Sequence, residues 1–235
     1  MLYIVPTPIG NMQDITLRCL EVLKAADFVL CEDTRQTKKL LDNYGVTARP
    51  VRYNEADEFS IKHCLDLLES GKNCALVSDA GTPCVSDPGW KLVKVAREKG
   101  IKITALPGPS ALTCALSGAG MGGGGFTFLG FMPKKQGKTV KLLTAAFALE
   151  RPVVVYESPY RIIKFLDLVT KNFGPAVRVV IARELTKTFE EWLSGTTAEV
   201  SANLAARKKI LGEFAVVLDA RQTEAQEEDE NDGDF

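Results

Sequence analysis

The sequence predicts an α/β protein, on three observations. Short apolar runs return at regular intervals, each run is followed by turn residues, and an amphipathic helical pattern follows most of the turns. Strands that alternate with helices in this way indicate a mostly parallel sheet that is covered on both faces. The 235 residues are enough for one large domain or two small ones, with a real hydrophobic core.

The first half of the chain carries the clearest alternation. Strands are expected at 2–5, 28–31, 74–77 and 101–106. Helices are expected at 14–26, 61–70 and 90–99. In the first of these helices Asp14 is the expected N-cap, and Leu17, Leu20 and Leu23 lie on one face.

A glycine-rich segment at 117–126 interrupts the pattern, and we place a domain boundary near residue 115. Beyond it, strands are expected at 126–131, 152–157, 177–184 and 213–219. Helices are expected at about 159–173 and 197–206, and the polar segment 133–138 is expected to be a connection. The expected organisation is an N-terminal domain with a mostly parallel sheet (1–115), a C-terminal domain with a mixed sheet (116–220) and a disordered acidic tail (221–235).

Composition narrows the class of protein. Hydrophobic residues make up 46% and charged residues 25%, as in ordinary globular proteins. The sequence has no apolar run long enough to span a bilayer, and its first apolar run is too short for a signal peptide, so we expect a cytoplasmic protein that does not contact membranes. The six cysteines form no CxxC pair and His63 is the one histidine, so no metal site is expected.

Charge is unevenly distributed. The net charge is −1, but seven of the 30 acidic residues lie in 223–235, which contains no Lys or Arg. The rest of the chain is therefore mildly basic, which is compatible with a polyanionic partner without establishing one.

Four polar loops follow the four expected strands of the first half. They are 6–11 (PTPIGN), 32–35 (EDTR), 78–89 (SDAGTPCVSDPG) and 107–111 (PGPSA). Ligands of open α/β sheets bind beyond the carboxyl ends of the strands, and Gly, Pro, Ser, Thr and Asp hold tight turns there. Any one of these loops could be an ordinary turn. Together they predict a small-molecule site with many backbone contacts.

Common nucleotide and nucleophile motifs do not explain these loops. Gly118, Gly120 and Gly123 match GxGxxG, but the match neither follows a strand nor opens a helix, so a dinucleotide site is not expected. The sequence contains neither a P-loop nor a GxSxG nucleophile elbow.

Eight segments, in this order, resemble the ribosomal RNA small-subunit methyltransferase I family of the tetrapyrrole-methylase superfamily. They are PTPIGNMQDIT (6–16), CEDTRQT (31–37), LVSDAGTPCVSDPG (76–89), LPGPSA (106–111), LGFMP (129–133), YESPYRI (156–162), ARELTKTFEE (182–191) and GEF (212–214). The resemblance spans roughly residues 1–219.

The resemblance implies two α/β domains of the tetrapyrrole-methylase type with the cofactor, S-adenosylmethionine, in the cleft between them, usually in a homodimer. It implies 2′-O-methylation of the ribose of a cytidine in small-subunit (16S) rRNA, with the rRNA or the assembled 30S subunit as partner. Several residues of the matching segments would bind the cofactor. They are Pro8, Asp79, Gly81, Thr82, Val85, Ser110, Ala111, Ser158 and Ala182.

Four charged residues at expected strand ends are candidates for catalysis or substrate contact: Asp33, Arg35, Glu157 and Arg183. A ribose hydroxyl is a weak acid, so a base or an oxyanion-stabilising cation would help its reaction. The alternative is structural, with Asp33–Arg35 and Glu157–Arg183 as ion pairs that brace the loops.

Four lysines are candidates for RNA binding, or belong to a solvated linker: Lys134, Lys135, Lys138 and Lys141.

Two departures from the family pattern keep other functions open. The segment 120–125 (GMGGGG) stands where relatives carry a Leu-Pro-Thr-Asp-Arg-like stretch, and the usual helical extension after the GEF strand is not expected here. The alternatives are a methylase of the same superfamily acting on a small molecule such as a tetrapyrrole, and an RNA-binding relative with a degenerate site.

Overall fold

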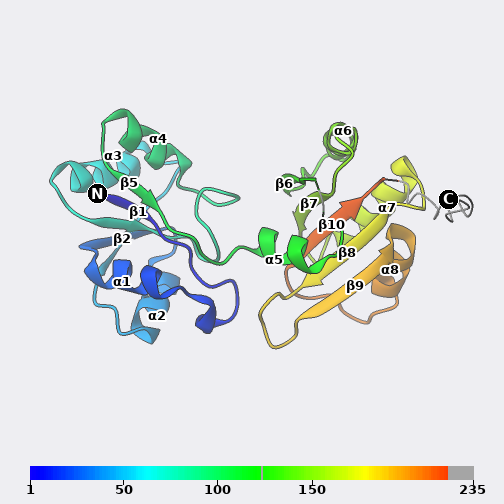
Figure 1. Cartoon of the computed structure of the whole chain (residues 1–235), viewed down its shortest axis with the longest axis horizontal. Helices are drawn as coiled ribbons and strands as arrows, with labels where there is room; N and C mark the ends of the chain where they lie inside the picture. Colours follow the sequence, from blue (N-terminus) through cyan, green and yellow to red (C-terminus); the bar gives the residue numbers. More distant parts are fainter. Residues whose placement is uncertain (123, 222–235) are drawn as a thin grey trace, which may run out of the picture. The chain divides into compact units, whose positions relative to one another are not determined.

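The computed structural model describes residues 1–122 and 124–221, and the contacts divide the chain into two compact units. Unit 1 consists of Met1–Cys114 with Leu185–Thr188, and unit 2 of Ala115–Glu184 with the chain from Phe189 onward. Each unit contains one five-stranded sheet with its own helices (Figure 1). The predicted α/β class is therefore confirmed.

Unit 1 holds a wholly parallel sheet in the order β3-β2-β4-β1-β5. Its strands are β1 (Leu2–Ile4), β2 (Phe28–Cys31), β3 (Arg49–Arg52), β4 (Cys74–Leu76) and β5 (Ile103–Ala105). Its helices are η1 (Met12–Asp14, a 3₁₀ turn), α1 (Leu17–Ala25), α2 (Thr34–Asn43), α3 (Glu58–Glu69) and α4 (Trp90–Glu98), and α5 (Ala111–Gly118) runs on into unit 2.

Both faces of this sheet are buried. Side chains of a strand alternate between the two faces, so each strand contributes to the core on both sides. In β2, Val29 packs in a cluster with Leu23 of α1, while Leu30 packs in a second cluster with Cys64 of α3 and Leu92 of α4. Helices thus cover both faces, as the parallel sheet requires.

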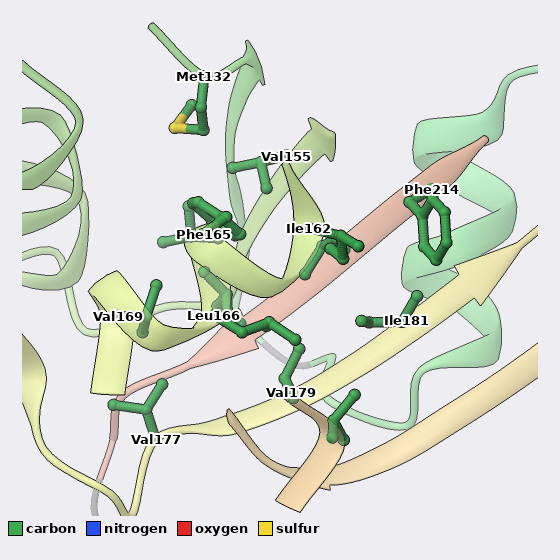
Figure 2. Packing of buried hydrophobic residues seen from close by; sticks show 14 of the residues in the cluster. Met132, Val155, Ile162, Phe165, Leu166, Val169, Val177, Val179, Ile181 and Phe214 are labelled. Carbon is green, nitrogen blue, oxygen red and sulfur yellow. The ribbon is translucent and has the colours of Figure 1, made fainter. Parts of the chain in front are cut away.

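Unit 2 holds a mixed sheet in the order β6-β7-β10-β8-β9, in which only β6 and β7 are parallel. Its strands are β6 (Thr127–Phe131), β7 (Val153–Glu157), β8 (Arg178–Arg183), β9 (Glu191–Thr196) and β10 (Phe214–Asp219). Its helices are α6 (Gln136–Phe147), α7 (Ile162–Phe173) and α8 (Thr197–Ala205). The core between α7 and one face of the sheet includes Val155, Ile162, Leu166 and Ile181 (Figure 2).

The structure corrects the start of the first helix. Thr16, not Asp14, is the N-cap of α1, because its Oγ1 accepts a hydrogen bond from Cys19 N at 3.1 Å. Leu17 is 80% exposed, so the buried side chains of α1 are Cys19 and Leu23 rather than a leucine stripe that includes Leu17.

Other elements were missing from the sequence prediction. Residues 133–138 are only partly a connection, because α6 begins at Gln136 and buries Leu143 and Ala146. The strands β3 and β9 lie at sheet edges, where a proline such as Pro50 and polar side chains are tolerated and obscure the strand pattern. Helices α2 and α5, which were not predicted, begin at Thr34 and Ala111, within the second polar loop and at the end of the fourth.

The described residues end at Arg221. The prediction of a disordered acidic tail therefore concerns residues that lie almost entirely outside the described ones. Arg221 itself is held in place: its guanidinium pairs with Asp219 at 2.7 Å and donates to Met121 O at 3.3 Å. Gly123, the last glycine of the GxGxxG match, also lies outside the described residues. Among the described helices, none has both the length and the apolar composition needed to cross a membrane.

Candidate functional site

In unit 1 the loops after β1 and β4 are joined by their backbones. Thr7 and Gly81 exchange two N–H···O=C hydrogen bonds of 2.9 Å each. Thr7 Oγ1 also donates to Ser78 O at 3.0 Å, and Ser78 Oγ donates to Gly81 O at 3.1 Å. Both loops follow neighbouring parallel strands, so their first residues meet at the same sheet edge.

The loop after β5 joins the same cluster. Thr82 Oγ1 donates to Pro109 O at 2.9 Å, and a Cβ on Gly108 would lie 2.6 Å from Pro6 Cβ. Gly81 has φ +81°, and a Cβ there would lie 3.2 Å from Ile9 Cγ2. Position 81 favours glycine for two reasons. Other residues rarely adopt its positive φ, and a Cβ there would be crowded by Ile9. Hydrogen bonds and close contacts therefore join three loops into one cradle built largely of backbone groups, which we call the loop cradle (6–11, 78–89 and 107–111).

Residues 185–188 belong to unit 1 because they contact the first loop. Asn11 N donates to Thr186 Oγ1 at 3.0 Å. A Cβ on Gly10 would come within 2.9 Å of atoms of Leu185, Thr186 and Lys187, so only glycine allows this approach.

Four carboxylates interact along the carboxyl ends of β3, β2 and β4. Burial, followed by the charges of Glu32 and Asp79, raises the pKa of Asp87 to about 6. Burial, followed by the charges of Asp79 and Glu55, raises the pKa of Glu32. Mutual repulsion of this kind makes the edge favourable for a cation. Within the described ranges, however, no group of His, Cys, Asp or Glu is arranged to hold a metal ion.

Glu55 also fixes the end of the long loop. Its Oε2 accepts a hydrogen bond from Gly89 N at 2.6 Å, and Lys91 Nζ donates to its backbone oxygen at 3.2 Å. Gly89 has φ +130°, and a Cβ on it would lie 2.7 Å from Cys84 Sγ and from Leu76 Cδ2. The loop therefore ends in a tight, glycine-dependent turn before α4.

The residues predicted to bind the cofactor fall mostly on the loop cradle. Pro8 and Gly81 are buried, Thr82 is half-buried, and Asp79 and Val85 are exposed. Ser110 and Ala111 stand at the start of α5, where Ser110 O accepts a hydrogen bond from Cys114 N at 3.0 Å. The other two, Ser158 and Ala182, belong to unit 2.

Asp33 and Arg35, proposed for catalysis, form an ion pair of 3.2 Å at the end of β2, and the Arg35 side chain is 88% exposed. Asp33 is also the N-cap of α2, since its Oδ1 accepts hydrogen bonds from Arg35 N at 2.8 Å and Gln36 N at 3.4 Å. Its hydrogen bonds with Arg35 lower the pKa of Asp33. The structure thus contains the Asp33–Arg35 ion pair of the structural alternative.

The Glu157–Arg183 ion pair, offered as the structural alternative to catalysis, is wrong, because each residue has another partner. Glu157 at the end of β7 pairs with Arg161 at 3.2 Å, one helical turn further along the chain. Arg183 at the end of β8 pairs with Glu191 at 3.2 Å, and Arg207 binds the same carboxylate with two hydrogen bonds of 2.7 Å. The two arginines lower the pKa of Glu191, Arg207 more strongly.

Glu157 is almost fully buried. Its Oε1 accepts a hydrogen bond from Ser158 N at 2.8 Å, while its Oε2 accepts none from any described residue and depends on the Arg161 charge. Burial raises the pKa of Glu157 despite these contacts. Arg161 also donates to Met132 O at 3.0 Å and to Pro133 O at 2.9 Å, so it ties the β6–α6 connection to the start of α7.

The four candidate RNA-binding lysines are all exposed. Lys134 and Lys135 lie in the β6–α6 connection, and Lys138 and Lys141 lie on α6.

Sequence reasoning missed Glu32, Glu55 and Asp87. Glu32 and Asp87 stand in loops that were singled out, but their mutual repulsion depends on which strands are neighbours, and the sequence does not give the strand order. Glu55 follows β3, an unpredicted strand, so no signal placed it at this edge.

Comparison with known proteins agrees with this geometry. The chain matches the family model of tetrapyrrole (corrin/porphyrin) methylases over residues 1–201. It is 40% identical over 229 residues to the ribosomal RNA small subunit methyltransferase I of Hydrogenobaculum sp., with 96% of this chain and 98% of that protein covered. It is 45% identical over 228 residues to the protein of that name from Neisseria meningitidis, with 96% and 78% covered.

Solved structures share the fold. Diphthine synthase superposes with a TM-score of 0.71 at 17% identity, with 93% of this chain and 89% of that one covered. Uroporphyrin-III C-methyl transferase from Thermus thermophilus, complexed with S-adenosyl homocysteine, gives 0.61 at 16% identity, with 92% and 96% covered. At such identities the likeness concerns the fold alone.

Two α/β units with glycine- and proline-rich loops at the carboxyl ends of a parallel sheet define a protein of the tetrapyrrole-methylase class. Within that class, the identities of 40–45% over nearly the whole sequence are decisive. The chain belongs to the ribosomal RNA small subunit methyltransferase I family and is a methyltransferase, which confirms the resemblance carried by its eight segments.

Proposed function

We propose that this chain transfers a methyl group from S-adenosylmethionine to the ribose 2′-hydroxyl of a cytidine in small-subunit rRNA. The observation that carries the proposal is the 40–45% identity to proteins named ribosomal RNA small subunit methyltransferase I, over 96% of this chain. The substrate is the rRNA itself or the assembled small subunit.

The loop cradle suits this cofactor chemically. S-adenosylmethionine carries a positive sulfonium and an amino acid end, and the cradle offers backbone groups beside the mutually repelling carboxylates of Glu32, Asp79 and Asp87. A bound cation relieves that repulsion. The residues proposed to hold the cofactor are Pro8, Asp79, Gly81, Thr82, Val85, Ser110, Ala111, Ser158 and Ala182.

When bound, the cofactor supplies a methyl group that positive sulfur already activates. The chain therefore has to orient the acceptor oxygen, where positioning contributes several kcal/mol, and to assist loss of its proton. Asp33 and Arg35 are proposed to contact the substrate at the exposed end of β2. The burial of Glu157 and its pairing with Arg161 favour an indirect, positioning role for Glu157.

A methylase that acts on a tetrapyrrole or another small molecule is the second candidate. The name of the matching family model favours it, as do the structural neighbours that act on porphyrins and corrins. Those neighbours are only 15–18% identical to this chain, so they carry much less weight than the rRNA methyltransferases. An RNA-binding relative with a degenerate site is the third, suggested by the glycines of 120–125.

One assay separates the three candidates. Methyl-labelled S-adenosylmethionine is incubated with the protein and either small subunits that lack the modification or a porphyrinoid. We expect label in the rRNA and none in the porphyrinoid, and digestion to nucleosides should recover it as 2′-O-methylcytidine. Label in the porphyrinoid alone would support the small-molecule methylase, and cofactor-independent RNA binding without label would support the degenerate relative.

We further propose a cytoplasmic homodimer, on the family resemblance alone. Sedimentation equilibrium should give twice the chain mass of 25.6 kDa, and a single-chain mass at working concentration would refute the dimer.

A further inference from the structure

A β-bulge in β6 places two phenylalanines on the same face of the unit 2 sheet. Phe128 pairs with Val154, but Gly130, rather than Leu129, pairs with Val155, so the register shifts by one residue. Gly130 has φ +63°, a conformation that glycine adopts readily. Without the bulge, residues 128 and 131 would point to opposite faces, since side chains alternate along a strand.

The bulge brings both rings against Tyr156 of β7, on the face opposite the core shown in Figure 2. The ring centroids of Phe128 and Phe131 lie 5.1 Å and 5.5 Å from that of Tyr156, both in edge-to-face geometry. Aromatic pairs prefer this edge-to-face geometry. Phe131 is nevertheless 65% exposed, so a ring packed against Tyr156 is also presented to solvent.

A second exposed ring stands on the neighbouring loop. Tyr160, 85% exposed, lies in the turn between β7 and α7. β6 and β7 are adjacent and parallel, so the segments that follow them leave the sheet at the same edge. Arg161 fixes the two segments together through its hydrogen bonds to Met132 O and Pro133 O.

The exposed charges that follow Phe131 along the chain are positive. Lys134, Lys135 and Lys138 are exposed in the connection and in the first turn of α6, and the sequence contains no Asp or Glu from residue 99 to residue 149. Lys135 is the N-cap of α6, and no side-chain hydrogen bond from the described residues caps this helix. Cations at a helix N-terminus are unfavourable by themselves, and a bound anion removes the penalty.

Exposure alone would not distinguish these rings. Phe59 of unit 1 is also 85% exposed, but it directly follows Asp57 and Glu58, so its surroundings repel a polyanion. The edge of unit 2 combines exposed rings with an acid-free lysine cluster. We call it the aromatic–lysine edge, formed by Phe131, Lys134, Lys135, Lys138 and Tyr160.

We propose that the aromatic–lysine edge binds an unpaired stretch of RNA, with bases stacked on Phe131 and Tyr160 and phosphates on the three lysines. This rests on the proposed function and deepens it by naming the form of the substrate. Bases in a duplex are stacked on each other and cannot offer a face, whereas splayed bases stack on aromatic rings. The lysines neutralise phosphates without reading sequence.

The test uses the full chain and a fluorescent single-stranded RNA oligonucleotide rich in cytidine, with a duplex of equal length for comparison. Affinity is measured by anisotropy at several salt concentrations for wild type, Phe131→Leu, Tyr160→Leu and the control Phe59→Leu. Leucine keeps an apolar side chain and removes the ring. We expect each edge variant to bind the single strand at least about fivefold more weakly, and the control to bind as wild type.

Salt dependence separates stacking from charge. Phe131→Leu and Tyr160→Leu should keep the wild-type slope of log affinity against log salt, whereas Lys134→Gln with Lys135→Gln should reduce the slope by about 0.7 for each lost phosphate contact. The proposal is overturned if the ring variants, shown to be folded by their thermal melts, bind the single strand as wild type does. It is also overturned if wild type prefers the duplex.

Methyl transfer to small subunits, measured on the same preparations, keeps the two proposals distinct. If wild type methylates the subunits while the ring variants bind single-stranded RNA normally, only the aromatic–lysine edge is wrong. If wild type transfers no methyl group to rRNA although binding depends on both rings, the proposed reaction is wrong and the edge stands as an RNA-binding surface.

Discussion

The loops at the carboxyl ends of the strands are built differently in the two units. In unit 1 they are joined by backbone hydrogen bonds, as between Thr7 and Gly81, and by glycines that allow close approach. In unit 2 the charged side chain of Arg161 joins two of them, through its hydrogen bonds to Met132 O and Pro133 O. Acidic groups dominate the first set of loops and basic groups the second.

This difference suggests two kinds of ligand. A cradle made of backbone leaves space for a small molecule and tolerates few substitutions at its glycines, because an added Cβ meets closely packed neighbouring atoms. A surface made of long cationic side chains and exposed rings suits a large, flexible polyanion whose binding depends on salt. The loop cradle of unit 1 thus suits the proposed cationic cofactor, and the aromatic–lysine edge of unit 2 suits the proposed RNA.

The largest expected effect is at Gly81. Gly81→Val should abolish measurable S-adenosylmethionine binding, because a β-branched residue resists φ +81° and its Cβ meets Ile9. Gly71→Val is the matched control, since Gly71 has φ +85° and open space around it. Calorimetry should show loss of binding in the first variant only. Equal affinities in both folded variants would remove the loop cradle from cofactor binding.

The next effect is on the stability of unit 2. Arg161→Gln leaves the buried Glu157 without its counter-charge, which should cost about 3 kcal/mol of unfolding free energy at pH 8. Arg35→Gln removes an exposed pair and should change little. Urea denaturation measures both.

The sign of the pH dependence follows from burial. Glu157 already has a raised pKa in the folded protein, and removal of Arg161 raises it further, so the folded state binds the proton more tightly than the unfolded chain. The stability deficit of Arg161→Gln should therefore be smallest at low pH and grow as pH rises. A deficit that shrinks as pH rises would contradict the assigned role of Glu157.

A smaller effect is expected at Asp87, whose pKa is raised from 3.8 to about 6. The stabilising contribution of its proton is complete below pH 3.8 and is lost as pH rises through about 6. Asp87→Asn should therefore gain melting temperature relative to wild type between pH 4 and pH 7 in the absence of cofactor. A constant difference over this range would show that burial and the charges of Glu32 and Asp79 do not raise the pKa of Asp87.

The smallest effect concerns Thr82. Its hydroxyl donates a hydrogen bond to Pro109 O. Thr82→Ala should therefore destabilise the folded loop by about 1 kcal/mol and weaken cofactor binding several-fold. Ser70→Ala removes a comparable hydroxyl bond to Leu67 O away from the cradle and serves as control. Unchanged cofactor affinity in Thr82→Ala would mean that this hydrogen bond does not shape the site.

The sequence predicted the central strands and the loops of unit 1 well because those features are local. Apolar runs such as 28–31 and the turn residues after them depend on neighbours along the chain. The edge strands β3 and β9 escaped prediction because solvent tolerates polar residues and Pro50 there.

Features that depend on strand order or register could not be predicted. The sequence leaves open whether Glu157 and Arg183, at the ends of two strands, could pair, and in the structure Glu157 pairs with Arg161 instead. The repulsion around Asp87 requires knowing that β2 and β4 are neighbours. The shared face of Phe128 and Phe131 requires a bulge that shifts the side-chain alternation by one residue.

The proposed division of labour between the loop cradle and the aromatic–lysine edge is tested most directly by measuring two affinities on the same two proteins. S-adenosylmethionine binding by calorimetry and single-stranded RNA binding by anisotropy are measured for Gly81→Val and for the Phe131→Leu/Tyr160→Leu double variant. We predict that Gly81→Val loses the cofactor and keeps RNA affinity, and that the double variant loses RNA affinity and keeps the cofactor. If one folded variant loses both affinities, or if the two losses are exchanged, the loop cradle and the aromatic–lysine edge do not divide the ligands as described.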